Sequence, residues 1–271
     1  MARSRRTRPQ NGAGIDMRHP NSARVEDYFL GGSANFEVDR VAAREIAEAF
    51  PEAEAAIRES RAFLGRAVRF LVDQGIDQFL DLGSGVAAVG NVHGLAHRLD
   101  PASRVVYVDS DPVSVAHGRQ VLAEVERAEV LDVDLLDVEE VLRQVRETGL
   151  VDWERPLGLL LVSVLNFVRD DADVDRLVRG YTGELVPGSY LVLTHATAAD
   201  LPPETAERVA AVYRRVKPPS WWRSTEQIAA LLADLELVPP GIVAPSLWRP
   251  EREPGTAPGR LSCRAAVARI P

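Results

Sequence analysis

The residues with the clearest chemical character surround a glycine turn. The stretch QFLDLGSGVAA is a short apolar run that carries Asp81 near its end and continues into Gly83, Ser84 and Gly85. Glycines after a predicted strand let backbone N–H groups approach a ligand, because no Cβ blocks the way. A second acid, Asp109, follows the run RVVYV. An acid at this point often accepts hydrogen bonds from ribose hydroxyls, so the pattern predicts a nucleotide-containing ligand.

The charge of Asp81 distinguishes between two such ligands. The turn fits the G-x-G-x-x-A pattern of dinucleotide sites and also suits S-adenosylmethionine. A dinucleotide would bring its pyrophosphate toward the Asp81 carboxylate, whereas S-adenosylmethionine brings an ammonium and a sulfonium. One such contact at ~4 Å is worth about 4 kcal/mol in Coulomb terms at an effective dielectric near 20. The sign favours the cationic ligand. In the alternative interpretation, Asp81 only caps the turn.

A third acidic site follows the next apolar run, in EVLDVDLLD. Asp134 could accept a hydrogen bond from the adenine amino group, and Leu135 could supply a backbone N–H and an apolar face. Asp132 and Asp137 remain alternatives, because a shift of one residue changes which acid points inward. Asp137 could equally be a helix N-cap.

These residues follow strands that alternate with helices, which predicts an α/β fold with a mostly parallel sheet. Ligands then gather at the carboxyl ends of the strands. Apolar runs predict strands at 78–82, 104–108, 129–133, 157–164, 189–194, 235–243 and 261–270. Three- and four-residue apolar spacing predicts helices at 35–50, 53–75, 88–99, 113–126, 137–147, 171–183 and 224–234, with Asn35 as a cap of the first.

Composition limits the classes of protein. The chain has 271 residues and a net charge of −8, and no stretch is apolar and long enough for a bilayer span. Cys263 is the only cysteine, which suits a reducing cytoplasm and excludes an internal disulfide. Lys217 is the only lysine, so the Gly-Lys phosphate loop is absent. The acidic balance disfavours nucleic acid as a partner, although residues 1–18 are basic and are predicted to be a disordered tail.

Two side chains are candidates for the catalytic chemistry. His195 ends the run LVLTHA, at the edge that would face an acceptor, and could act as a base. Its alternative is a histidine that hydrogen-bonds loop backbone. Asn166 follows the run at 157–164 and could orient an acceptor. The Pro-Pro-Tyr that follows such an asparagine in some N-methyltransferases is missing, which argues against DNA adenine or glutamine as the acceptor.

Other patterns carry weaker signals. His93 and His97 have the spacing of a metal pair but lack the glutamate of H-E-x-x-H. The acids from Asp171 to Asp175 lack the glycine of a calcium loop and suit the first turn of a helix. No metal site is therefore expected. Trp221 and Trp222 could line an apolar acceptor pocket or pack on the sheet.

Several stretches, taken together and in order, resemble one bacterial family. They are FLDLGSG, VVYVDSDP, DVDLLD and LLLVSVLNFVRDD, with NSARVEDYFLGGSANFEVDR and RAFLGRAVRFL before them and GSYLVLTHAT, RSTEQIAALLADLELVPPGIV and WRP in the second half of the chain. The chain resembles, from about residue 19 to 270, S-adenosyl-L-methionine-dependent methyltransferases formerly filed as a domain of unknown function.

The resemblance implies a Rossmann-like class I methyltransferase fold, with a seven-stranded, mostly parallel sheet, an antiparallel last strand and a helical N-terminal extension. Residues 19–75 would form a helical cover, and 76–271 the cofactor domain with an insertion around 197–224. The cofactor is S-adenosyl-L-methionine. The predicted cofactor-binding residues are Asp81, Gly83, Ser84, Gly85, Asp109, Ser110, Asp134, Leu135 and Ser163, with Tyr28 and Gly32 from the cover.

The function predicted from the sequence is methyl transfer to an unidentified small-molecule acceptor in the cytoplasm. Two alternatives stay open. One is a non-catalytic S-adenosylmethionine-binding regulator, and the other is an NAD-dependent oxidoreductase. An open acceptor cavity beside the cofactor would favour the enzyme over the regulator.

Overall fold

The computed structural model describes residues 15–86, 91–251 and 262–271. Its strands are β1 (Gln78–Leu82), β2 (Arg104–Asp109), β3 (Ala128–Asp132), β4 (Gly158–Val162), β5 (Tyr190–Ala196), β6 (Glu236–Leu237) and β7 (Cys263–Arg269). Its helices are α1 (Ser22–Phe29), α2 (Glu37–Ala49), α3 (Ala53–Asp73), α4 (Val92–Leu99), α5 (Pro112–Val121), α6 (Val138–Thr148), α7 (Asp171–Thr182), α8 (Pro203–Tyr213) and α9 (Thr225–Leu231), with 3₁₀ turns η1 (Leu165–Phe167) and η2 (Pro245–Leu247).

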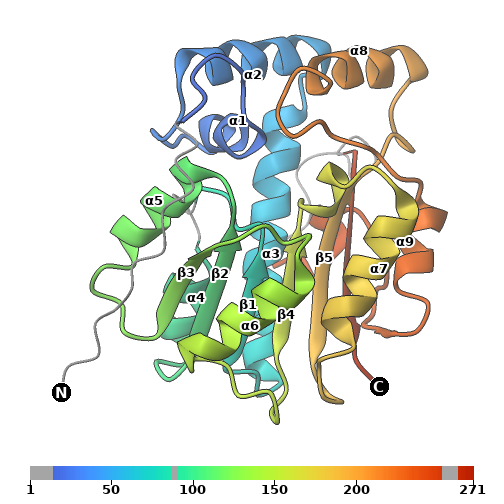
Figure 1. Ribbon diagram of the computed structural model, residues 1–271. Coiled ribbons are helices and arrows are strands. Elements are labelled where there is room, and N and C mark those ends of the chain that lie inside the picture. The colour runs from blue at the N-terminus through green and yellow to red at the C-terminus, as the bar shows by residue number, and fades with distance from the viewer. Residues whose placement is uncertain (1–14, 87–90, 252–261) are drawn as a thin grey trace.

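The seven strands form one sheet in the order β3-β2-β1-β4-β5-β7-β6. The first five strands are parallel, and β7 runs antiparallel to both of its neighbours. Strand order reverses between β1 and β4, which is where open α/β sheets bind their ligands. The predicted Rossmann-like sheet with an antiparallel last strand is confirmed (Figure 1).

Helices cover both faces of this sheet because its strands are apolar on both sides. Alternate residues of β5 show the pattern: Leu191 and Leu193 pack toward α6, α7 and α9, and Tyr190 and Val192 pack toward α3 and α4. At Gly158, an added Cβ would lie 2.8 Å from Leu71 and from Phe79, so the contact of β4 with α3 requires a glycine.

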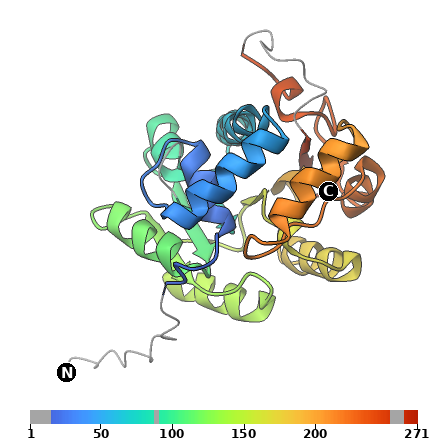
Figure 2. The same cartoon turned by 90° about the horizontal axis from the view of Figure 1, so that it is seen from above.

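A third layer lies over the carboxyl ends of the strands (Figures 1 and 2). Its core joins α1, α2 and α8 to the beginning of α3. Helix α3 takes part in two layers. Ala53 and Ala56 lie in the core of the third layer, whereas Phe63 and Leu71 pack against one face of the sheet. The N-terminal helices and the segment before α9 are therefore brought to the same end of the sheet.

Several local predictions need correction. The apolar run 235–243 forms a strand only at Glu236–Leu237, because Pro239 and Pro240 lack the N–H that a sheet ladder needs. Phe36, not Asn35, stands at the N-cap of α2, since the Asn35 amide donates to Asp27 Oδ2 at 2.8 Å. Ala87, Ala88 and residues 1–14 of the predicted tail lie outside the described residues. No helix in the described parts of the chain is both long and apolar enough to cross a bilayer.

Candidate functional site

The glycine turn joins the end of β1 to the end of β2. Gly83 N donates to Val108 O at 2.8 Å, and Gly85 N donates to Asp109 Oδ2 at 2.7 Å. Gly83 has φ +68°, and an added Cβ would lie 2.2 Å from a methyl of Val164, so only glycine fits there. The turn thus holds Ser84 and its neighbours against the edge of the sheet.

Asp81 lies just before this turn and is 5% exposed. Burial raises the pKa of its carboxyl from 3.8 to about 7; the nearby Arg61 opposes this shift, and Asp109 adds to it. Among the described residues, none donates a hydrogen bond to the Asp81 carboxylate. A buried carboxylate in this state gains most from a cation placed beside it.

Asp109 ends β2 and organises the loop after it. Its Oδ2 accepts from Gly85 N, and its Oδ1 accepts from Asp111 N at 2.8 Å. Burial raises the pKa of this carboxyl to about 6, although both backbone hydrogen bonds lower it. Each carboxylate oxygen has a second lone pair, so hydroxyl donors can still bind here. Ser110 lies beside it, exposed.

The structure distinguishes among Asp132, Asp134 and Asp137, the three acids that the sequence left as alternatives for contact with the adenine. Asp134 is exposed at the cavity described below, where its Oδ1 accepts from Leu136 N at 3.0 Å. Leu135 O accepts from Tyr181 Oη at 2.7 Å, which fixes the loop. Asp132 lies 4.0 Å from Arg119, and Asp137 caps α6 by accepting from Glu140 N. Neither of these two acids lines the cavity.

These segments surround a cavity of about 420 Å³, here called the large cavity. Its size lies in the range of small-molecule and cofactor sites. The lining includes nine of the predicted residues: Asp81, Gly83, Ser84, Gly85, Asp109, Ser110, Asp134, Leu135 and Ser163. It also includes residues that sequence reasoning missed: Asn21, Ser22, Ala23, Glu26, Arg61 and Lys217. Arg61 opens the stretch RAFLGRAVRFL, which was a usable signal for its role.

The N-terminal segment covers the large cavity through the first turns of α1. Ser22, Ala23 and Glu26 share one helix face, and Asn21 caps the helix by accepting from Ala23 N at 2.9 Å. The Asn21 amide also donates to Asp111 Oδ1 at 3.1 Å, which ties the helix to the loop after β2. Ser22 N donates to Lys217 O at 3.0 Å on the other side.

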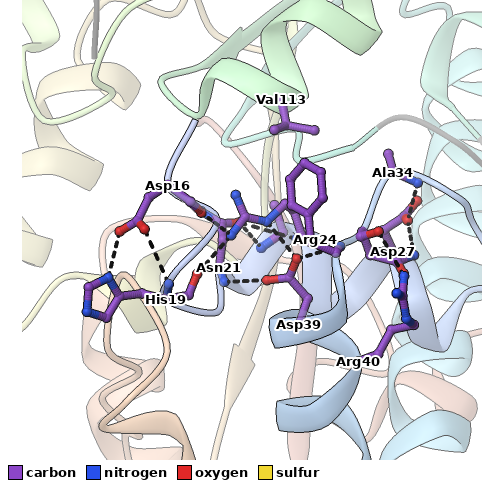
Figure 3. A network of polar contacts seen from close by, with 12 residues as sticks. Asp16, His19, Asn21, Arg24, Asp27, Ala34, Asp39, Arg40 and Val113 are labelled. Atoms are coloured by element: carbon purple, nitrogen blue, oxygen red, sulfur yellow. Dashed lines mark hydrogen bonds and ion pairs between the residues drawn. The ribbon is translucent and has the colours of Figure 1, made fainter. Parts of the chain in front are cut away.

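A buried ion pair between α1 and α2 fixes the position of the covering helix α1 (Figure 3). Arg24 Nε donates to Asp39 Oδ2 at 2.8 Å, and the two side chains are 2% and 0% exposed. Asp39 also accepts from Asn21 N and Phe36 N, so its oxygens are well satisfied. The Arg24 Nη2 group donates to two backbone carbonyls, those of Asp16 and His19.

Tyr28 and Gly32, the predicted cover residues, lie outside the lining of the large cavity. The Tyr28 ring packs against Phe29 at a centroid distance of 5.9 Å. Gly32 lies against Asp27, and an added Cβ would come within 1.9 Å of Asp27 Oδ1. Asp27 accepts from Ala34 N at 2.9 Å, so this segment shapes the turn between α1 and α2. The residues of this cover that line the large cavity come instead from the start of α1 and, in α3, from Arg61 and Leu64.

A second cavity of about 110 Å³, the small cavity, lies between the third layer and the sheet. Ser22, Glu26, Ser163 and Phe167 line both cavities. The other residues of its wall are mainly apolar and include Val25, Ile46, Phe50, Ala53, Ile57, Val209, Tyr213 and Trp222. The two cavities therefore adjoin across α1 and the loop after β4.

Ser163 lies at this junction in a strained backbone conformation, with φ +56°. Its Oγ lies 3.0 Å from Thr194 Oγ1 and 3.3 Å from Ser60 Oγ, and its N–H donates to Thr194 Oγ1 at 2.9 Å. Non-glycine residues rarely adopt this conformation, and such strain is found preferentially at functional sites.

The two catalytic candidates have different surroundings. Asn166 lines the small cavity and is 6% exposed, and its Oδ1 is buried without a hydrogen-bond partner among the described residues. His195 is fully buried and lines neither cavity. Its Nδ1 lies 2.8 Å from Ala196 O and its Nε2 lies 3.1 Å from Arg223 Nη1, and burial lowers the ring pKa to about 4. This geometry matches a histidine that holds loop backbone.

The histidine pair, the acids at the start of α7 and the two tryptophans make contacts typical of structural side chains. His93 Nδ1 lies 2.8 Å from Tyr107 Oη, and His97 Nε2 lies 2.9 Å from Ser103 O. Asp171 begins α7 and accepts from Arg223 Nε at 2.8 Å. Trp222 lines the small cavity, whereas the Trp221 ring is partly exposed beneath Arg169.

Comparisons with known proteins agree with this architecture. Residues 8–271 match the family described as S-adenosyl methyltransferase. A solved structure of a "putative methyltransferase" from Thermobifida fusca YX is 37% identical, with 97% of this chain and 99% of that chain covered and a TM-score of 0.88. A DUF574 family protein from Streptomyces avermitilis MA-4680 is 33% identical, with 95% and 100% covered and a TM-score of 0.90. No curated protein matches the chain.

The match extends over the sheet, the glycine turn and the third layer alike. It covers nearly the whole described chain, including the acids at the ends of β1 and β2. The chain belongs to the S-adenosyl methyltransferase family: it is a methyltransferase, and S-adenosyl-L-methionine is its cofactor.

Proposed function

We propose that the protein transfers a methyl group from S-adenosylmethionine in the large cavity to a small-molecule acceptor in the small cavity. The observation that carries this proposal is that the two cavities adjoin and share Ser22, Glu26, Ser163 and Phe167. A binding protein without catalysis has no need of a second cavity beside the first. The arrangement therefore favours the enzyme over a regulator.

The lining of the large cavity suits S-adenosylmethionine in three respects. Asp81 is a buried carboxylate without a hydrogen-bond donor among the described residues, and it would hold the ammonium of the methionine end. Gly83 lets the turn pack against Val164 at the edge of the cavity, where an added Cβ would clash. Arg61, in the same lining, offers a cation for the methionine carboxylate.

The other predicted residues have roles that follow from their place along the cavity. Gly83, Ser84 and Gly85 would present backbone to the methionine end. Asp109 and Ser110 would accept from or donate to the ribose hydroxyls. Asp134 would accept from the adenine amino group while Leu135 packs on the ring. These assignments are supported by the order of the segments along the carboxyl ends of β1, β2 and β3.

The cofactor supplies an electrophilic methyl group with a good leaving group, so the protein has mainly to align the acceptor and exclude water. The first turns of α1 cover the junction of the two cavities, and apolar side chains of α2 and α8 close the small cavity. Asn166 would orient the acceptor. For His195 we propose a positioning role, because its ring contacts Arg223, which donates in turn to the backbone carbonyls of residues 165, 168 and 169.

A small molecule suits the small cavity better than a nucleic acid. The net charge of the chain is −8, and the described lining of the small cavity contains the acidic residue Glu26 and no lysine, arginine or histidine. A phosphate backbone would meet repulsion there. We also propose a cytoplasmic location, supported by the single cysteine, Cys263, whose buried thiol has its pKa raised to about 12.

Isothermal titration tests the donor site directly. S-adenosylhomocysteine should bind, and NAD should not. Binding of NAD without a response to S-adenosylhomocysteine would overturn the assignment of the large cavity as the donor site. A crystal structure with S-adenosylhomocysteine should then place its sulfur toward the small cavity; a wall between the two would favour the regulator instead.

A further inference from the structure

We propose that the acceptor is a small apolar amine, and that Glu26 holds its nitrogen and takes up the proton that the ammonium form must lose before methylation. This inference rests on the proposed function, since it assigns the molecule bound in the small cavity. It depends on three features: the charge of the cavity, the unsatisfied oxygen of Asn166 and the size of the apolar space.

The charge of the small cavity selects against anions. Among its described lining residues, Glu26 is the carboxylate, and no lysine, arginine or histidine is present. Burial raises the pKa of Tyr213 and of Cys263 to about 12, so both stay neutral near pH 7. A carboxylate or phosphate in the acceptor would find no cation in this lining, whereas an ammonium would find Glu26.

Glu26 is placed where the two cavities meet. It lines both of them, and Arg61 Nη2 lies 3.2 Å from its Oε1 on the side of the large cavity. That contact fixes the carboxylate on α1 while leaving Oε2 without a hydrogen bond from the described residues. An acceptor nitrogen bound to Oε2 would lie beside the junction through which the methyl group must pass.

Asn166 supplies a second, independent acceptor. Its Oδ1 is buried and has no hydrogen-bond partner among the described residues, and the residue lines the small cavity but not the large one. A buried polar atom left in this state indicates a missing donor. The donor expected here is an N–H of the bound acceptor.

Two hydrogen-bond acceptors distinguish an amine from an alcohol. A neutral primary amine has two N–H donors and one lone pair, so it can donate to Glu26 and to Asn166 while its lone pair faces the methyl group. A hydroxyl has one donor and can satisfy only one of the two side chains. The pair Glu26 and Asn166 therefore matches a nitrogen nucleophile.

The apolar volume limits the rest of the molecule. The small cavity measures about 110 Å³, whereas a dry engineered cavity of about 150 Å³ holds benzene. Phe50, Ile57, Val209 and Trp222 contribute apolar wall. The body of the acceptor is thus at most the size of one aromatic ring or a short branched alkyl chain.

The proton balance assigns Glu26 its chemical role. An amine that enters as the ammonium gives a proton to the Glu26 carboxylate and becomes nucleophilic. Its nitrogen then forms a bond to the methyl carbon as the carbon–sulfur bond breaks, with the electron pair of that bond leaving on sulfur as a thioether. The secondary ammonium that results carries the positive charge formerly on sulfur. Glu26 releases its own proton to solvent when the products leave.

The test uses the full-length protein with benzylamine, isobutylamine, benzyl alcohol and benzoate, and S-adenosylmethionine carrying a deuterated methyl group. Mass spectrometry should show the label on the two amines, with benzyl alcohol and benzoate unlabelled. Calorimetry in the presence of S-adenosylhomocysteine should show benzylamine binding and no benzoate binding. This second readout does not depend on turnover.

Two variants assign the effect to the named side chains. Glu26→Gln should lower kcat/KM for benzylamine by about 100-fold, the usual contribution of a general base. Asn166→Ala should raise KM for benzylamine by about tenfold and leave S-adenosylhomocysteine affinity unchanged, because Asn166 does not line the large cavity. Glu54→Gln, on the exposed side of α3, is the matched control and should behave as the unaltered protein.

The outcomes separate this inference from the proposed function. A protein that fails to bind S-adenosylhomocysteine overturns both. A protein that binds it but labels benzyl alcohol or benzoate in preference to the amines overturns the amine assignment alone. That assignment also fails if neither amine binds or is labelled, or if Glu26→Gln retains the full rate with a labelled amine.

Discussion

Asp39 and Asp81 are both buried carboxylates, and their hydrogen-bond partners differ completely. Asp39 is 0% exposed and accepts from Arg24 Nε and from two backbone N–H groups. Asp81 is 5% exposed, and no described residue donates to it. Folding alone satisfies Asp39, so it supports structure. We propose that the ammonium of the cofactor compensates the Asp81 carboxylate, which would recover the cost of burying it.

The largest expected effect comes from breaking the Asp39 pair. Arg24→Met leaves a buried carboxylate without its cation and should lower the free energy of unfolding by about 3–5 kcal/mol. Urea denaturation measures this change. Arg44→Met removes an arginine whose ion pair with Glu37 is exposed, and it should change stability little. Equal effects of the two substitutions would contradict a structural role for the buried pair.

Substitution of Asp81 is expected to raise the free energy of unfolding of the ligand-free protein, whereas substitution of Arg24 lowers it. The folded state raises the pKa of its carboxyl from 3.8 to about 7, so the ligand-free protein loses stability as the pH rises through this interval. Asp81→Asn removes this penalty and should stabilise the ligand-free protein at pH 8 by on the order of 3 kcal/mol, with little effect at pH 4. Thermal unfolding at the two pH values measures the difference.

The same substitution should weaken S-adenosylmethionine binding, because the amide cannot compensate the ammonium. Stability and affinity should thus move in opposite directions at Asp81 and in the same direction at Arg24. A variant Asp81→Asn that is both less stable and fully able to bind the cofactor would contradict the assigned role.

A smaller loss is expected at the end of β2. Asp109→Ala removes the acceptor of Gly85 N and Asp111 N and the proposed partner of the ribose, and it should weaken cofactor binding by about 1–3 kcal/mol. Calorimetric titration with S-adenosylhomocysteine measures the affinity. An unchanged affinity would show that the ribose is bound elsewhere.

The pH dependence of cofactor binding is a further test of the role proposed for Asp81. In the proposed role, the ionised form of Asp81 binds the cofactor's ammonium, so cofactor binding should release a proton and affinity should rise with pH through about 7. Between pH 6 and pH 8 the dissociation constant of S-adenosylmethionine should fall about tenfold. The profile of Asp81→Asn should be flatter, with the remaining slope below pH 7 coming from Asp109, whose carboxyl pKa is raised to about 6.

Most of the predicted lining of the large cavity, the proposed donor site, could be found from the sequence because this lining is built from short local segments. Each acid stands directly after an apolar run, and parallel strands bring their carboxyl ends to one edge. The open choice among Asp132, Asp134 and Asp137 required the register of β3, which composition does not specify. The structure brings Asp134 to the cavity lining.

The small cavity could not be predicted in this way. Its walls come from α1, α2, α3, α8, the loop after β4, the end of β5 with the loops after it, and the start of β7, which are far apart in the chain. The placement of His195 shows a further limit: successive residues of a strand point to opposite faces, and it is Thr194 that reaches Ser163. The sequence indicated that Trp222 could line an apolar pocket, but no pattern in it indicated that Glu26 would line the small cavity.

Helix α3 extends from the third layer to the far end of the sheet, with Ser60 and Arg61 between its two packed ends. In the proposed function, the helix would fix the distance between the donor site and the acceptor site. One residue inserted in the middle of α3 would rotate the first half of the helix, and the third layer packed on it, by about 100° relative to the sheet. The third-layer side chains that line the small cavity would then no longer face the large cavity. Natural variation in acceptor size is therefore expected in the side chains of α2 and α8, while the length of α3 stays constant.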